Sequence, residues 1–133
     1  MESEKRLNTA WLREMHKGEL ETYATLSGDL NSIHLDHAQA VKAGHPGIIC
    51  HGMLSMTDIG NWLIYEMKGW RLVAYSCRFV APMNVGTQLK VSGVFTEQIT
   101  IKGIQVAIKI VAEDSEGEVK VTGRAVFQKL STK

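Results

Sequence analysis

Apolar and polar residues alternate along most of the second half of the chain. An alternation with a period of two turns one face of a strand toward a core and the other toward water. The turn-forming glycines Gly103 and Gly117 separate the last three alternating stretches. We therefore predict strands over four ranges, which are 71–80, 88–102, 105–113 and 118–130.

The first half of the chain has a pattern that is typical of helices. Apolar side chains cover most of the circumference of 51–68, which predicts a long helix that is buried on most sides. Gly69 follows this stretch and can end the helix. Shorter elements are expected over three further ranges, which are 5–14 (a strand), 17–26 and 36–43 (helices).

These elements predict one way of building a core. A helix that is apolar nearly all round has to be covered, and long strands with one apolar face have to cover something. A curved antiparallel sheet wrapped around a long central helix satisfies both needs. The chain has 133 residues, and neither a linker nor an internal repeat divides it. We therefore predict a single α+β domain over 1–133.

Composition excludes several classes of protein. The 15 basic and 14 acidic residues leave a formal net charge of +1, which argues against a nucleic-acid-binding protein. The 2 cysteines cannot form a disulfide scaffold. The longest apolar stretch contains Asp58, Asn61 and Glu66, so we expect no membrane span. No secretory signal is visible either, and we expect a soluble, cytoplasmic protein.

Candidate chemistry lies in the loop before the long helix and at the start of that helix. Asp29 and His34 are five residues apart, and a carboxylate beside an imidazole can hold a water molecule and move its proton. Gly52 offers a backbone N–H at a helix N-terminus, which can stabilise a carbonyl oxygen that becomes negative. A simpler interpretation makes Asp29 a turn residue and His34 a capping or surface histidine.

The same residues form motifs that resemble those of a known family. Residues 27–36 read S-G-D-x-N-x-x-H-x-D, and residues 48–54 read I-x-x-H-G-M-L. This pair of motifs is similar to that of the MaoC-type (R)-specific enoyl-CoA hydratases, also called the hydratase 2 family. Residues 77–87 resemble the strand–turn–strand segment R-F-x-x-P-V-x-x-G-D-x-L of that family.

The resemblance implies a hot-dog fold and a homodimer whose two sheets join edge to edge. It implies a reversible syn addition of water to a trans-2-enoyl thioester, which gives the (3R)-hydroxyacyl thioester of fatty acid metabolism. By this resemblance Asp29 and His34 hold the catalytic water, the N–H of Gly52 binds the thioester carbonyl, and Asn31 shapes the loop. His51 is expected to orient the start of the helix. The chemistry needs neither a metal nor an organic cofactor.

Several alternatives stay open at this stage. The same residues would serve a 3-hydroxyacyl-ACP dehydratase, so the substrate is an acyl-CoA or an acyl-ACP thioester. A non-catalytic acyl-thioester-binding subunit is a third possibility, because Ser32 replaces the proline that is usual in the family motif and leaves the loop freer. Asp29 is the candidate base for water and His34 the candidate that orients it, but a shared water allows the two roles to be exchanged.

Other residues have two interpretations each. Met53, Met56, Trp62 and Leu63 are core side chains by pattern, and they could also line an acyl pocket. The basic residues at 42, 68, 71 and 78 could meet CoA phosphates, although solvated surface charges are the simpler interpretation. The histidines at 34, 37 and 45 with Asp36 do not have the spacing of a zinc site, so we predict no metal.

Overall fold

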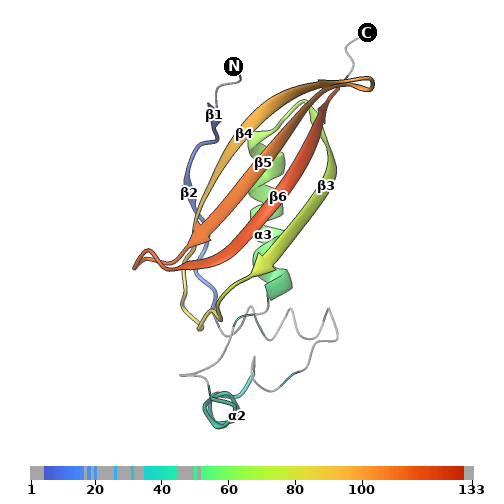
Figure 1. The fold of residues 1–133 in the computed structure, drawn as a ribbon. Coiled ribbons are helices and arrows are strands. Elements are labelled where there is room, and N and C mark those ends of the chain that lie inside the picture. The colour runs from blue at the N-terminus through green and yellow to red at the C-terminus, as the bar shows by residue number, and fades with distance from the viewer. Residues whose placement is uncertain are drawn as a thin grey trace.

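A computed structural model of the protein describes residues 5–16, 18, 20, 26, 31, 35–44, 50 and 52–130. Its main feature is a six-stranded sheet in which all pairings are antiparallel (Figure 1). The strands are β1 (Lys5–Arg6), β2 (Ala10–Trp11), β3 (Trp70–Phe79), β4 (Lys90–Thr100), β5 (Gly103–Glu113) and β6 (Val119–Lys129). The helices whose bounds fall within the described residues are α2 (His37–Lys42) and α3 (Gly52–Glu66).

The strand order is β1-β4-β5-β6-β3, and β2 also pairs with β4. The hairpins β4–β5 and β5–β6 place neighbours in sequence side by side. Gly103 and Gly117 adopt φ angles of 115° and 85° in the two turns, a region that L side chains rarely adopt. Strand β3 reaches the sheet only after α3 and pairs with β6, so it forms one edge of the described sheet.

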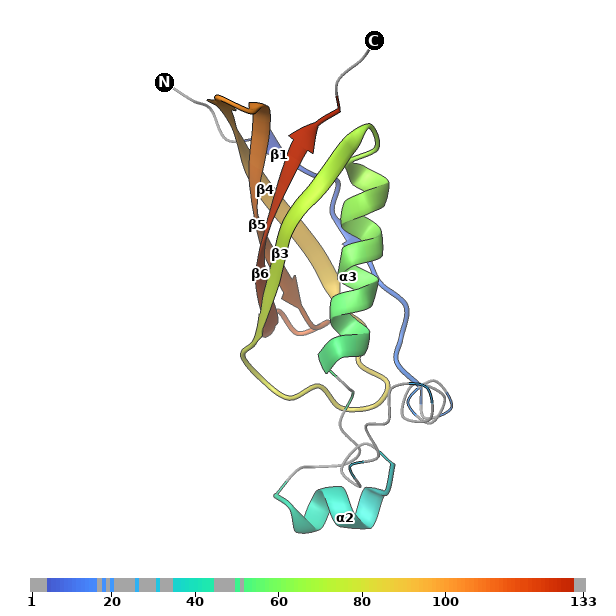
Figure 2. The same cartoon turned by 90° about the vertical axis from the view of Figure 1, so that its right-hand side faces the viewer.

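Helix α3 lies along one face of the curved sheet (Figure 2). Its side chains Ser55, Ile59 and Leu63 are fully buried. The strands supply the other side of this core with apolar residues at every second position, which are Val106, Ile108, Ile110, Ala112, Val121, Ala125 and Phe127. Burying these side chains against one another is the main stabilising term of the fold.

The N-terminal segment holds the opposite side of α3. Asn8 donates its backbone N–H to Glu66 Oε1 at 2.7 Å and accepts a hydrogen bond from Trp62 Nε1 at 3.2 Å. Arg13 forms a bidentate ion pair with Asp58, with Nε 3.1 Å from Oδ2 and Nη2 3.3 Å from Oδ1. Because these contacts turn the chain toward the helix, the single strand predicted over 5–14 becomes two short strands, β1 and β2.

The sequence-based predictions of the longer elements are confirmed. Strands β3 to β6 and helix α3 lie within about two residues of the predicted bounds. The helix predicted over 36–43 is α2, where the Asp36 carboxylate caps the first turn by accepting from the N–H of Gln39 at 3.1 Å. The helix predicted over 17–26 falls largely outside the described residues. No helix within the described ranges is long and apolar enough to cross a membrane.

Candidate active site

The chain enters α3 through a segment that is fixed against the loop before β4. Cys50 is 3% exposed, donates its backbone N–H to the carbonyl of Met83 at 2.6 Å and directs its thiol to the carbonyl of Asn84 at 3.3 Å. One turn into the helix, the Ser55 hydroxyl lies 3.7 Å from the sulfur of Met83. The start of α3 therefore has a defined position relative to the end of the sheet.

Gly52 begins α3 and lies beneath an aromatic ring from the edge strand. A Cβ atom added at Gly52 would lie 3.0 Å from Cε2 of Phe79, which is tighter than most real Cβ contacts, so the ring would have to shift. Glycine is thus favoured here by close approach rather than by an unusual φ angle. The first N–H groups of a helix have no intrahelical acceptor, and the helix dipole adds partial positive charge to them. This end of α3 can therefore stabilise a developing negative charge.

Tyr75 ties the edge strand to the first half of α3. Its hydroxyl donates to the carbonyl of Met56 at 2.7 Å, and its ring packs against Gly60, where an added Cβ would lie 3.2 Å away. The thiol of Cys77 donates to the Tyr75 hydroxyl at 3.3 Å. Burial raises the pKa of Tyr75 above its ordinary value, and the contact with Cys77 raises it further. Tyr75 is therefore a neutral donor at physiological pH.

Removing the Tyr75 hydroxyl should lower stability without moving the backbone. In Tyr75→Phe the carbonyl of Met56 and the thiol of Cys77 both lose a partner, so we expect a loss of about 1 kcal/mol in the free energy of unfolding. Urea denaturation at neutral pH measures this change. An unchanged midpoint would show that the hydrogen bond contributes nothing to the packing of β3 on α3.

The contribution of Tyr75 and Cys77 to stability can also be measured through its dependence on pH. Burial raises the pKa of the Cys77 thiol as well as that of Tyr75, so the folded state holds both protons more tightly than the unfolded state does. Their contribution is complete below about pH 8 and is lost as the pH rises toward 10 and above. In Tyr75→Phe the part of this loss that is due to the phenol should disappear.

The structure places some of the predicted site residues and not others. Gly52 lies at the start of α3, as predicted, and Asn31 is exposed. Asp29, His34 and His51 lie outside the described residues. Within the described part of the chain, no group of three His, Cys, Asp or Glu side chains could hold a metal ion.

A comparison with models of protein families matches residues 2–116 to the MaoC like domain. The match covers most of the sheet, all of α3 and the loop that precedes it. The chain belongs to the MaoC-like family.

Curated relatives of this MaoC-like domain include much larger proteins. It is 33% identical over 112 residues to the fatty acid synthase subunit beta of Saccharomyces cerevisiae, covering 81% of this chain and 5% of the relative. It is 30% identical over 71 residues to the mitochondrial 3-hydroxyacyl-[acyl-carrier-protein] dehydratase of Arabidopsis thaliana, covering 53% of this chain and 43% of the relative. The chain thus spans only a small part of the first and under half of the second.

Solved structures match nearly the whole domain. The (R)-hydratase from A. caviae involved in PHA biosynthesis is 25% identical, with a TM-score of 0.75 over 95% of this chain and 97% of that chain. The R-hydratase PhaJ1 from Pseudomonas aeruginosa is 24% identical, with a TM-score of 0.80 over 98% and 90%. The predicted hot-dog fold is confirmed, with an open sheet of six strands and one long helix.

The four residues predicted to line an acyl pocket are divided between surface and core in this MaoC-like domain. Met53 is 54% exposed on α3, next to Gly52, and Met56 is half-buried. Trp62 and Leu63 are buried against the sheet, and the Trp62 ring fills the space above Gly93. An acyl pocket beside Gly52 would therefore meet Met53 and Met56 first, because Trp62 and Leu63 lie about three turns along the helix from Gly52.

Sequence reasoning missed the residues that hold the start of α3. Phe79 and Met83 were noted only as part of the resemblance over 77–87, and Tyr75 carried no signal beyond its place in an apolar pattern. Their contacts with α3 join positions 15 to 28 residues apart. The glycines Gly52 and Gly60 were the available signal, because a glycine inside a helix often marks the close approach of another element.

Proposed function

We propose that this MaoC-like domain is a hydro-lyase that adds water reversibly to trans-2-enoyl thioesters and gives (3R)-hydroxyacyl thioesters. The observation that carries the proposal is the placement of Gly52 at the N-terminus of α3, against the ring of Phe79. The motif residues Asp29 and His34 and the similarity to (R)-hydratases support it. In this proposal Asp29 and His34 are the catalytic residues that hold the water.

The reaction needs three functions, and the proposed residues supply each of them. The oxygen of water forms a bond to C3, and its proton passes to Asp29 or His34. The electron pair of the C2–C3 double bond moves toward the thioester, and the resulting enolate oxygen accepts a hydrogen bond from the N–H of Gly52. A proton then returns to C2 on the same face, which restores the protein and completes the syn addition.

The N-terminus of α3 suits the enolate better than it suits the neutral thioester. The N–H of Gly52 and the helix dipole interact with charge, and that charge is largest in the transition state. Removing one such donor from an enzyme typically costs about 100- to 1,000-fold in kcat. In the proposal His51 and Asn31 shape the loop around this donor and take no part in proton transfer.

We also propose a homodimer that joins two sheets through β3. This strand has ten residues, and its outer edge has no pairing partner among the described strands. Val73 and Phe79 of this strand and Val80 directly after it are 42–49% exposed. Ile64 and Tyr65 of α3 are 56% and 66% exposed. Long edge strands with apolar side chains are normally covered in proteins that stay soluble. Two copies related by a twofold axis would cover each other in this way.

A hydration assay with chiral product analysis tests the proposed function. Purified protein mixed with crotonyl-CoA should remove the absorbance of the enoyl thioester and yield only the (3R)-hydroxy product. The same assay over longer acyl chains and on carrier-protein thioesters separates a CoA hydratase from a carrier-protein dehydratase. Thioester binding without turnover of either substrate would favour a non-catalytic acyl-thioester-binding subunit instead.

A further inference from the structure

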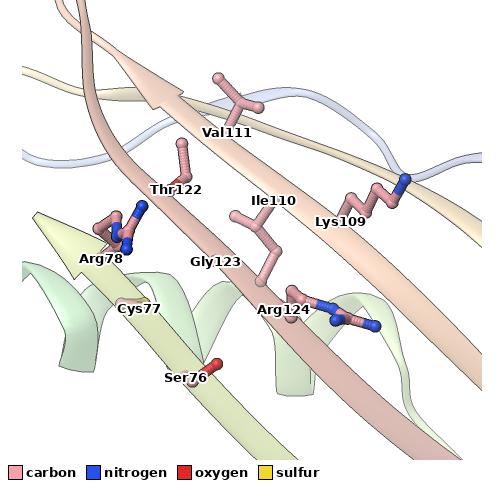
Figure 3. A pocket seen from close by; sticks show the side chains of 9 residues that line it. All are labelled: Ser76, Cys77, Arg78, Lys109, Ile110, Val111, Thr122, Gly123 and Arg124. Atoms are coloured by element: carbon pink, nitrogen blue, oxygen red, sulfur yellow. The ribbon is translucent and has the colours of Figure 1, made fainter. Parts of the chain in front are cut away.

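The face of the sheet that points away from α3 contains a hollow of about 670 Å³. We call it the outer hollow and define it by the polar side chains that line it, which are Ser76, Arg78, Lys109, Thr122 and Arg124. Figure 3 shows these side chains on the strands with α3 behind them. The hollow is separated by the sheet from the start of α3 and is not part of the site described above.

The strand register brings like charges together in the outer hollow. Lys109 of β5 lies directly opposite Arg124 of β6. Like charges at directly opposed positions of neighbouring strands destabilise a sheet. On its other side Arg124 faces Ser76 of edge strand β3, and the next outward position of β3 is Arg78, opposite Thr122. Three cations thus share six adjacent outward positions of three strands.

The three cations have no acidic partner in the described part of the chain. Among the described residues, none of Arg78, Lys109 and Arg124 forms an ion pair or a side-chain hydrogen bond. The positions of β4 that continue the two rows are Val94 and Ser92, both uncharged. This contrasts with Lys120 on the same face, which lies 3.4 Å from Glu118 and 3.9 Å from Asp114.

Lys109 and Arg124 also line a second, smaller hollow of about 200 Å³ on the β4 side. Lys109 and Arg124 therefore lie between two hollows of the same face. Thr96 and Gln98 are polar residues that line the smaller hollow. A ligand in the outer hollow would face Lys109, Arg124 and Ser76 in one row of paired positions and Thr122 and Arg78 in the next.

We propose that the outer hollow binds a small ligand that carries clustered phosphate groups. Guanidinium groups bind phosphate oxygens through paired hydrogen bonds, and hydroxyl groups complete such sites. The volume falls within the range of about 300–1,000 Å³ that small-ligand sites occupy. A bound polyanion would also remove the repulsion between Lys109 and Arg124. A second copy of the chain fits poorly, because a twofold contact through this face would set cations against cations.

Two sources can supply such phosphates. One is the nucleotide end of a CoA thioester substrate, an assignment that rests on the proposed function. The other is a free phosphorylated molecule that binds independently of the reaction. The chemistry of recognition is the same in both cases, so binding measurements test the site and kinetic measurements separate the sources.

Calorimetric titration with inorganic pyrophosphate at low salt tests the site directly. We expect saturable binding by the wild type and at least a tenfold weaker affinity in Lys109→Gln/Arg124→Gln. The control variant Lys102→Gln/Lys129→Gln removes the same charge from the β4–β5 turn and from the end of β6, and should bind within about twofold of the wild type. Without ligand, the Lys109→Gln/Arg124→Gln variant should melt no lower than the wild type, because it has lost a repulsive pair.

Two results would overturn the proposal. One is an affinity for pyrophosphate that the Lys109→Gln/Arg124→Gln variant retains. The other is tighter binding of polyglutamate than of pyrophosphate through the same two residues, which would assign this face to an acidic polypeptide.

Kinetics with two thioesters then identify the source of the phosphates. If they belong to the substrate, the Lys109→Gln/Arg124→Gln variant should show at least a tenfold higher KM for crotonyl-CoA, with kcat unchanged and with no effect on crotonyl-pantetheine. If both KM values are unchanged while pyrophosphate binding is lost, the ligand is a free phosphorylated molecule. A wild type that turns over neither thioester would contradict the proposed function, and the titration would still decide the outer hollow.

Discussion

Replacing Asp29 by asparagine is expected to lower kcat for enoyl-thioester hydration by about 100- to 10,000-fold. Asparagine keeps the size and polarity of the side chain but cannot accept the proton of the attacking water. The substitution should leave the melting temperature unchanged, because the loop loses a charge and no apolar contact. Steady-state hydration of crotonyl-CoA beside a thermal melt measures both quantities.

The chain offers a matched control for this substitution. Asp36 lies seven residues farther along and caps α2 through the N–H of Gln39. Asparagine caps helices about as well as aspartate does, so Asp36→Asn should be folded and active. Equal activity of the Asp29→Asn and Asp36→Asn variants would remove Asp29 from the mechanism. His34→Asn should resemble Asp29→Asn, since the two side chains are proposed to hold one water.

Replacing Gly52 by alanine is expected to lower both stability and activity. The new Cβ would lie 3.0 Å from the Phe79 ring, so the ring or the start of the helix must move. Overpacking of this kind costs about 1–3 kcal/mol. Helix propensity alone favours alanine over glycine by up to about 1 kcal/mol, so a loss of stability reports the clash and not the helix. Displacement of the N–H at position 52 should lower hydration at least about tenfold.

A double-mutant cycle separates the clash from other effects. In a Phe79→Ala background the ring is absent, and Gly52→Ala should cost nothing or stabilise the helix slightly. Urea denaturation of the four proteins gives the interaction energy between the two positions. The same loss of stability in both backgrounds would show that Phe79 does not determine the need for glycine at this position.

The sequence predicts the sheet and the central helix well because their patterns are regular. Strands β5 and β6 bury one face along their middle and β4 buries the same face in its first half, so alternation predicts both their position and their inward residues there. Helix α3 is predicted by its apolar circumference, and the short helix predicted over 36–43 is α2, which Asp36 caps in the structure.

Contacts between elements are less accessible from the sequence. The backbone of Asn8 forms hydrogen bonds with the side chains of Trp62 and Glu66, and these bonds interrupt the first strand. No local sequence pattern predicts this interruption. Likewise β3 gains an irregularity between Leu72 and Ala74, where the pairing with β6 shifts by one residue. The outer hollow also depends on register, because Lys109 and Arg124 are 15 residues apart in the sequence and become neighbours only in the paired strands.

The candidate site also combines features that the local sequence predicts with features that depend on contacts between elements. The motifs predict Asp29, His34 and Gly52 as site residues through their residue types and spacing. Phe79 and Tyr75, which position the start of α3, come from a strand whose pairing is not encoded nearby. The candidate residues were therefore predictable from local sequence, while the contacts that position the start of α3 required the fold.

The central claim is that the start of α3 binds the thioester carbonyl. A crystal structure with butyryl-CoA, a saturated thioester that cannot be hydrated, tests it most directly. We predict the thioester oxygen within about 2.7–3.1 Å of the backbone nitrogen of Gly52, with C3 facing Asp29 and His34. A well-ordered thioester whose oxygen lies away from the start of α3, with Asp29 and His34 turned away from C3, would contradict the account.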